Sequence, residues 1–260
     1  MFKIKDCKLF VKIINFMRTA CFDFAILYED KHIRLTGKDG GHVVFTDVWI
    51  PYTYFDKFDK IETDMEYDEV DECDYEVPHM DEFTIEDLYK ATKLCKGDLS
   101  WEDAGNKYNF KNTNQRFGVT KTANLQTFVA GDFSTVEFPC SFPFSLKLIK
   151  DIIDKLTVYG EKMYIRVESG KLFVKGIASQ GDEKEIEYDI EYKGEEEFHS
   201  EYGYAMFKYL NSAVKLTEEL TINFGTNFPM QFVFNLEGEI VVNMIMAPRV
   251  PDDEDTYGDN

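Results

Sequence analysis

Lysine residues recur in four stretches of the chain at spacings that bring their side chains together on a helix. Lys90 and Lys93 are three residues apart, and Lys208 and Lys215 are seven apart with Asn211 between them. Positions at such spacings share one face of a helix, and ammonium groups gathered in this way neutralise phosphates without reading a base sequence. The candidate residues for these contacts are Lys8, Lys12, Lys90, Lys93, Lys147, Lys150, Lys208 and Lys215.

An ordinary solvated face is the alternative for any one of these helices. Eleven of the 29 basic residues, Arg18 included, nevertheless fall on the four predicted helices of a chain whose formal net charge is -20. The acidic residues concentrate elsewhere, in Asp64–Asp74, in Gly181–Glu191 and in the C-terminal tail. Because the distribution of charge matters more than its sum, we interpret the helices as a phosphate-facing surface on a protein that otherwise repels nucleic acid.

The carboxylates of Asp64–Asp74 indicate a second chemistry, a two-metal phosphoryl-transfer site. They crowd into one segment instead of converging from rigid elements, and no nucleophile or positioned base accompanies them. Charge runs are more often solvated loops. We therefore expect no catalytic activity, no metal and no other cofactor. The enzyme alternative requires cleavage of DNA that is lost when Glu69 and Asp71 are replaced.

Cysteine and histidine residues form no metal-ligand pattern. The five cysteines contain no C-x-x-C pair and are expected to be reduced, and the four histidines are scattered singly, so no structural zinc site is predicted. His79, beside Pro78, is expected in a loop. The sequence also has no P-loop, no glycine-rich nucleotide motif and no serine–histidine–aspartate context.

The composition is that of a folded protein. A hydrophobic content of 44% with 23 Phe and 15 Tyr excludes wholesale disorder. No apolar run approaches the roughly 18 residues that a bilayer-spanning helix needs, and the N-terminus lacks the core of a signal peptide. We expect a soluble intracellular protein with no membrane partner.

The elements that must position the lysines occur in the same order twice. Apolar residues at helical spacing predict helices over 8–18, 83–96, 144–156 and 204–215, the second with a capping-box-like start at Thr84. Runs rich in β-branched and aromatic residues predict the strands. They cover 2–6, 21–28, 32–36, 42–50, 99–103, 107–111, 116–121, 137–142, 163–167, 171–177, 185–192, 220–224, 230–236 and 240–246.

Two copies of strand–helix–three strands–helix–three strands predict two similar α+β domains, each an antiparallel sheet with helices on one face. We place the N-terminal domain at 1–122 and the C-terminal domain at 137–250, followed by an acidic tail at 251–260. The segment 123–136 has no clear periodicity and is predicted to be a connecting linker. Loops of this length are uncommon unless they have a function.

Several segments resemble PCNA, the archaeal and eukaryotic DNA sliding clamp family. The most specific match is M246-A-P-R-V-P-D-D-E-D, with F228-P-M and Y209-L-N before it. K38-D-G followed by G41-H-V-V resembles the family's Asp-x-x-His-Val step, and F83-T-I-E-D-L-Y-K-A-T-K resembles its first-domain helix. In the order of elements, the resemblance covers nearly the whole chain.

The resemblance implies a processivity factor of DNA replication and repair. Subunits of the family join head to tail into a closed trimeric ring whose helices line a hole threaded by duplex DNA. Its partners would be DNA polymerase, the clamp loader and other client proteins. The eight lysines would line the hole, although the first helix, with Lys8 and Lys12, starts earlier here than in the family and leaves its register open.

Ring closure requires exposed edge strands that pair between subunits. The stretch K184-E-I-E-Y-D-I-E-Y alternates apolar and acidic residues at the position of the family's second-domain interface strand, and its partner would be the last strand of the first domain. The basic Arg116 and Lys121 would face the acidic strand. An ordinary half-solvated strand is the alternative. The predicted interface residues are Arg116, Phe117, Val119, Lys121, Ile186, Tyr188 and Ile190.

In this family, client peptides insert aromatic and aliphatic side chains into a pocket beside the linker, the His-Val step and the C-terminal Ala-Pro segment. The matching positions here are His42, Val43, Leu125, Phe128, Pro229, Met246, Ala247 and Pro248. Phe128 and Phe133 stand in the linker where the family has mostly aliphatic and acidic residues, so the preferred client motif stays open.

Two functions remain open at this point. One is a replicative clamp subunit, in a homotrimer or a heterotrimer. The other is an interaction protein of clamp fold that does not encircle DNA, such as a monomeric processivity factor or a non-replicative paralogue. The resemblance leaves the setting open too: nuclear in a eukaryote, cytoplasmic for an archaeal or viral member.

Overall fold

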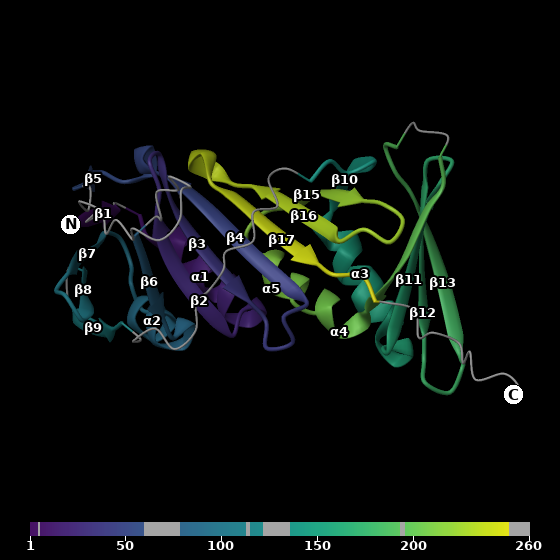
Figure 1. The fold of residues 1–260 in the computed structure, drawn as a ribbon, viewed down its shortest axis with the longest axis horizontal. Coiled ribbons are helices and arrows are strands. Elements are labelled where there is room, and N and C mark those ends of the chain that lie inside the picture. The colour runs from purple at the N-terminus through teal and green to yellow at the C-terminus, as the bar shows by residue number, and fades with distance from the viewer. Residues whose placement is uncertain (5, 60–78, 113–114, 122–135, 193–195, 250–260) are drawn as a thin grey trace, which may run out of the picture. The chain divides into compact units, whose positions relative to one another are not determined.

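The computed structural model describes residues 1–4, 6–59, 79–112, 115–121, 136–192 and 196–249. The chain forms two compact units, one of Met1–Asp132 with Asn235–Asn243 and the other of Phe133–Phe234 with Met244–Asn260 (Figure 1). We call them unit 1 and unit 2. The predicted linker 123–136, apart from its last residue, and the acidic segments 64–74 and 251–260 lie outside the described residues.

The described residues of unit 1 form antiparallel strands and two α-helices. Strands β5, β1, β7, β8 and β9 neighbour one another in that order, as do β4, β3, β2 and β6. Its elements are β1 (Phe2–Ile4), α1 (Lys8–Ala20), β2 (Asp23–Tyr28), β3 (His32–Lys38), β4 (Val44–Pro51), β5 (Lys57–Phe58), β6 (His79–Phe83), α2 (Ile85–Thr92), β7 (Leu99–Asp103), β8 (Lys107–Asn112) and β9 (Arg116–Thr120), with a 3₁₀ turn at Tyr52–Tyr54 and another at Glu237–Glu239.

The helices of unit 1 form because each has one apolar face. On α1, Ile13, Met17 and Ala20 are buried, whereas Lys8 and Lys12 are exposed. Helix α1 packs against α2 and beside β3 and β4 (Figure 1). Thr84 occupies the N-cap position of α2 as predicted, but its side chain accepts no capping hydrogen bond among the described residues.

Unit 2 repeats the plan. Strands β13, β12, β11 and β14 form a four-stranded antiparallel sheet, and β10, β15 and β16 pair in that order. Its elements are β10 (Cys140–Ser145), α3 (Leu146–Leu156), β11 (Lys162–Glu168), β12 (Lys171–Ile177), β13 (Glu183–Asp189), β14 (Phe198–Gly203), α4 (Tyr204–Phe207), α5 (Leu210–Ala213), β15 (Glu219–Phe224), β16 (Met230–Asn235) and β17 (Val241–Met246), with a 3₁₀ turn at Thr157–Tyr159. Within β17 the chain passes from unit 1, which ends at Asn243, to unit 2, which resumes at Met244.

The sequence of helix α3 shows most clearly why the helix forms. Ser145 caps it, since its hydroxyl accepts a hydrogen bond from the backbone N–H of Lys147 at 3.2 Å. The apolar residues Leu146, Ile149 and Ile153 recur at helical spacing and are buried, and lysines occupy the opposite face. The helical prediction for this segment is confirmed.

The sequence predictions were wrong at several places, among them α2, which ends at Thr92 and not at residue 96, and β5, which was not predicted. The predicted single helix over 204–215 is two four-residue helices, α4 and α5. Backbone bonds join residues three apart across the break, from Asn211 to Lys208 and from Ser212 to Tyr209, so the turn is tighter than an α-helix. Strand β14 was not predicted at all. His79, expected in a loop, begins β6 and pairs with Tyr28.

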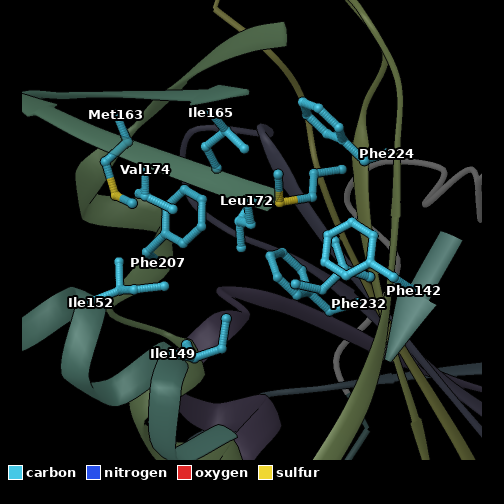
Figure 2. Close-up of a pocket in the computed structure, with 12 residues that line it drawn as sticks. Phe142, Ile149, Ile152, Met163, Ile165, Leu172, Val174, Phe207, Phe224 and Phe232 are labelled. Atoms are coloured by element: carbon cyan, nitrogen blue, oxygen red, sulfur yellow. The ribbon is translucent and has the colours of Figure 1, made fainter. Parts of the chain in front are cut away.

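The core of unit 2 encloses a small apolar cavity. Side chains from α3, β11, β12 and β16 point toward one another around it (Figure 2). The space is about that of one water molecule, and since no polar atom lines it, we expect it to be dry. It belongs to the packing of the unit, not to a ligand site.

No helix in the described part of the chain is long and apolar enough to cross a membrane.

Candidate functional site

The lysines of unit 1 are exposed on α1 and α2, but they differ in their partners. Lys8 lies 3.5 Å from Asp6, and Lys90 lies 3.4 Å from Asp87. Lys12 has no ion pair with any described residue, and the same holds for Lys93. A lysine without an internal partner is free to pair with an external anion.

Arg18 fastens the two helices of unit 1 together. Its guanidinium lies 3.3 Å from the carboxylate of Glu86 on α2 and 4.2 Å from the centre of the Tyr89 ring. Cation–π and ionic contacts of this kind favour one arrangement of the helix pair. Arg18 therefore supports the surface that carries the lysines.

Helix α3 carries three lysines, and two of them form ion pairs within the helix. Lys150 lies 2.6 Å from Asp154, and Lys155 lies 2.5 Å from Asp151. Lys147 is exposed in the first turn and has no such partner in the described chain. Lys155 and Tyr188 hydrogen-bond to Asp151 and lower the pKa of its carboxyl group.

The break between α4 and α5 changes how the last two lysines are presented. Lys208 is the C-cap of α4, and its ammonium group lies 5.1 Å from the centre of the Tyr204 ring. Lys215 follows α5 and lies outside it. Both are exposed, but they do not lie on one continuous helix as predicted.

The two predicted interface strands are both sheet edges. Strand β9 ends the order β5-β1-β7-β8-β9, and β13 begins the order β13-β12-β11-β14. An edge strand presents unpaired N–H and C=O groups to which another strand can add. The alternation of apolar and acidic residues and the resemblance to the clamp family predicted these strands as the subunit interface. Their position at sheet edges supplies the physical condition for pairing.

The side chains of β9 divide between the two faces of the sheet. Val119 is 1% exposed and packs in the core of unit 1, so it offers a partner only its backbone. Phe117, on the same face, is half-buried, and Arg116 points to the other face and is exposed. Lys121 lies 2.9 Å from Asp103 and over the Tyr108 ring. It is thus engaged within unit 1, and facing the acidic strand of a neighbouring copy remains a prediction.

Strand β13 divides in the same way. Ile186, Tyr188 and Ile190 are half-buried. The Tyr188 hydroxyl donates to the carboxylate of Asp151 at 2.9 Å, which places this face beside α3. Burial, and then the nearby Asp151 carboxylate, raise the pKa of Tyr188, so the phenol stays a donor. Glu185 and Glu187 point to the opposite face, where Lys171 lies 2.9 Å from Glu187.

The predicted docking residues fall into two groups, one in each unit. In unit 1, Asp39 fixes the His-Val step, because its carboxylate accepts hydrogen bonds from the backbone N–H groups of Val43 at 2.8 Å and Val44 at 2.9 Å. His42 is exposed and has a positive φ of 55°, a conformation that few side chains adopt without such support.

In unit 2, Pro229, Ala247 and Pro248 are half-buried, whereas Met246 is fully buried at the end of β17. Met246 therefore anchors the segment and does not line a surface. The remaining two predicted residues, Leu125 and Phe128, lie outside the described part of the chain.

Comparisons with known proteins decide what this arrangement is. No protein-family model matches the chain. The DNA polymerase sliding clamp 3 of Sulfurisphaera tokodaii is 24% identical over 258 residues, which is 95% of this chain and 98% of that protein. DNA polymerase sliding clamp 2 of Saccharolobus solfataricus is 23% identical over 256 residues, which is 95% of this chain and 98% of that protein.

Solved structures agree with this similarity. The PCNA2–PCNA3 complex of Sulfolobus tokodaii matches with a TM-score of 0.75 at 20% identity, over 95% of this chain and 98% of that one. PCNA of Entamoeba histolytica matches with a TM-score of 0.78 at 13% identity, over 96% of this chain and 98% of that one. The chain has the fold of a PCNA sliding clamp. The predicted α+β clamp class is confirmed.

The clamp fold accounts for the duplicated plan and for the edge position of β9 and β13. Within the described residues, no three histidine, cysteine or acidic side chains gather as metal ligands. The carboxylates of Asp64–Asp74, the basis of the enzyme alternative, lie outside those residues.

Sequence reasoning missed the residues that hold the C-terminal segment. Arg249 donates its backbone N–H to the carbonyl of Glu201 at 2.7 Å, and its Nε lies 3.1 Å from the Glu201 carboxylate. Glu201 belongs to β14, the strand that was not predicted. The only signal in the sequence was the alternation of Phe198, Ser200 and Tyr202, in which a serine occupies a buried position.

Proposed function

We propose that this protein is a DNA sliding clamp, which encircles duplex DNA and tethers DNA polymerase and other replication and repair enzymes to it. The curated relatives that align over 95% of the chain are named DNA polymerase sliding clamps. The observation that carries the proposal is that the chain combines the clamp fold with packed helices in both units, whose exposed lysines include several without an ion pair to any described residue. The role requires no catalytic step.

The lysines supply attraction to DNA without sequence specificity. Lys12, Lys93, Lys147, Lys208 and Lys215 are the strongest candidates for phosphate contacts, since no described carboxylate competes for them. Lys8, Lys90 and Lys150 contribute less, because a phosphate must displace Asp6, Asp87 or Asp154. Contacts restricted to the DNA backbone carry no base information and permit sliding. Retention then depends on closure around the DNA and not on tight binding.

The two edge strands favour a second copy of this chain as the neighbour in the ring. On one face, β9 presents Arg116, with Lys111 paired beside it on β8, and β13 presents Glu185 and Glu187. Joining β9 of one copy to β13 of the next brings opposite charges together. A β13–β13 contact would oppose carboxylates, which costs free energy.

The other faces of these strands match as well. Phe117 and the buried Val119 face the α2 side of unit 1, and Ile186 and Tyr188 face the α3 side of unit 2. A continuous sheet across the contact would thus keep its apolar residues on the helix side and its charges on the other. Because the two edges are different surfaces, the contact is head-to-tail and closes into a ring if the rotation between copies allows it.

The docking of client peptides is the third part of the proposal. His42 and Val43 in unit 1, with Pro229, Ala247 and Pro248 in unit 2, remain the candidate contacts, and Met246 supports them from the core. Partly exposed apolar residues on a protein of this charge are typical of an interaction site. Clients would be DNA polymerase, the clamp loader and other proteins with short docking segments.

The mass of the purified protein in solution tests the proposal against a non-encircling protein of clamp fold. Light scattering at micromolar concentration should give three times the 30.3 kDa mass of the chain. A strict monomer would contradict the ring. A stable trimer of this chain alone would also favour copies of itself over distinct subunits.

A further inference from the structure

Strand β14 is the second edge of the four-stranded sheet in unit 2, in the order β13-β12-β11-β14. A free edge of this kind is usually covered by another segment of the protein. Two segments contact it here, and they carry the docking residues of unit 2. One is the loop between β15 and β16, which contains Pro229, and the other is Ala247–Arg249, after β17.

The loop is held at two points. The backbone N–H of His199 donates to the Thr226 hydroxyl at 3.1 Å, and the Tyr202 hydroxyl donates to the carbonyl of Phe228 at 2.8 Å. Tyr202 is fully buried, so its hydroxyl is fixed by packing as well as by the bond. The residue after Phe228 is Pro229, whose position follows from that of the carbonyl.

The C-terminal segment is held by Glu201. The Arg249 backbone N–H donates to the Glu201 carbonyl at 2.7 Å, and the Arg249 Nε lies 3.1 Å from the Glu201 carboxylate, which Lys162 also approaches at 3.6 Å. The side chains of Arg249 and Glu201 are about one-third exposed, at 36% and 32%. The pair holds Ala247 and Pro248 between a buried Met246 and a fixed residue 249.

We propose that Glu201 and Arg249 are positioning residues of the partner-binding surface. They hold Ala247–Pro248 against β14, so that this part of the surface is already ordered when a docking peptide binds. Neighbouring residues of one strand then fix both parts of the surface, Glu201 the C-terminal segment and Tyr202 the loop with Pro229. Because this part of the surface is ordered before binding, the entropy cost of ordering it does not reduce the affinity for the peptide. The inference rests on the proposed function, because it concerns the docking of clients to the clamp.

The test compares the full-length variants Arg249→Gln and Glu201→Gln with Arg166→Gln. Arg166 lies on the neighbouring strand β11, pairs with Glu168 and lies over the Phe173 ring, so its variant is a control for the loss of one charge. The first readout is hydrogen exchange at the Arg249 amide. The second is the affinity for a fluorescein-labelled synthetic peptide with leucine and phenylalanine anchors.

We expect exchange at residue 249 to accelerate about fivefold and peptide affinity to fall about fivefold in both test variants, with mass in solution and DNA association unchanged. The reversed pair Arg249→Glu with Glu201→Arg should recover most of the affinity, and Arg166→Gln should match the wild type. Equal peptide affinity in Arg249→Gln and wild type would overturn the positioning role alone. Failure of the wild-type protein to bind the peptide would overturn the docking function and the inference with it.

Discussion

The ammonium group of Lys150 lies 2.6 Å from the carboxylate of Asp154, one turn further along α3. Lys147, one turn earlier on the same helix, has no such neighbour among the described residues. The same contrast separates Lys90 on α2, which pairs with Asp87, from Lys93, the C-cap residue of that helix. Exposed pairs contribute little to stability, but they set which lysines are available to phosphates.

We predict that the double variant Lys93→Ala with Lys147→Ala weakens DNA association more than Lys90→Ala with Lys150→Ala. Each double variant removes two positive charges from α2 and α3, so the long-range field changes equally. Each lost phosphate contact lowers the slope of log affinity against log salt by about 1. Titrations of duplex DNA across a range of salt concentrations measure the slope.

Asp154→Asn supplies the reverse experiment, since it frees Lys150 and should tighten DNA association. Equal losses in the two double variants, together with no gain from Asp154→Asn, would contradict the division into paired and unpaired lysines.

Reversing one charge at the subunit edge should weaken assembly. Arg116→Glu places a carboxylate opposite the acidic face of β13, and we predict that the dissociation constant of the oligomer rises about tenfold or more. Adding Glu185→Lys should restore part of the loss. Lys31→Glu, an equal charge change in an exposed turn, is the control. Sedimentation at several concentrations measures the shift, and an unchanged oligomer in Arg116→Glu would exclude β9 from the contact.

The buried thiol of Cys21 should make the protein sensitive to alkali. Burial raises the pKa of Cys21 from 9.0 to about 12. Between these values the unfolded chain loses the proton while the folded chain keeps it, so stability present below pH 9 falls as the pH rises toward 12. Urea unfolding at about pH 8 and about pH 11 should show a smaller loss of stability in Cys21→Ala than in the wild type. The same loss in both proteins would assign the effect to other groups.

Filling the cavity of unit 2 should stabilise the protein. Val174→Ile adds one methyl group toward the space in Figure 2, and burying it contributes about 0.8 kcal/mol. Ile152→Val, which enlarges the same cavity, should cost about 1 kcal/mol. Thermal unfolding measures both. A lower unfolding temperature for Val174→Ile would mean that the packing around Val174 has no room for the added group.

The sequence was sufficient to predict the helices and strands in which apolar residues recur at a regular spacing. Helix α3 combines a serine cap with apolar residues at helical spacing, and β12 alternates buried and half-buried residues along its whole length. Such patterns reflect one dominant force, the burial of one face. They also located the exposed lysines of α1, α2 and α3, because a solvated face is the complement of a buried one.

The failures have different physical causes. The segment 204–215 buries apolar residues in two short helices at the spacing that one long helix would use, so the pattern could not reveal the break. Strand β14 buries Ser200 between Phe198 and Tyr202, which weakens its alternation. The ion pair of Lys121 could not be predicted, since its partner Asp103 is brought to it only when β7, β8 and β9 pair.

Retention on circular against linear DNA tests the central proposal most directly. The protein is loaded by a clamp loader onto nicked circular duplex DNA, washed with high salt to remove electrostatic binding, and then exposed to a nuclease that linearises half of the sample. A clamp that encircles DNA should stay on the circles and leave the linear molecules by sliding off their ends. Equal retention on both, or release from both by salt alone, would contradict the account.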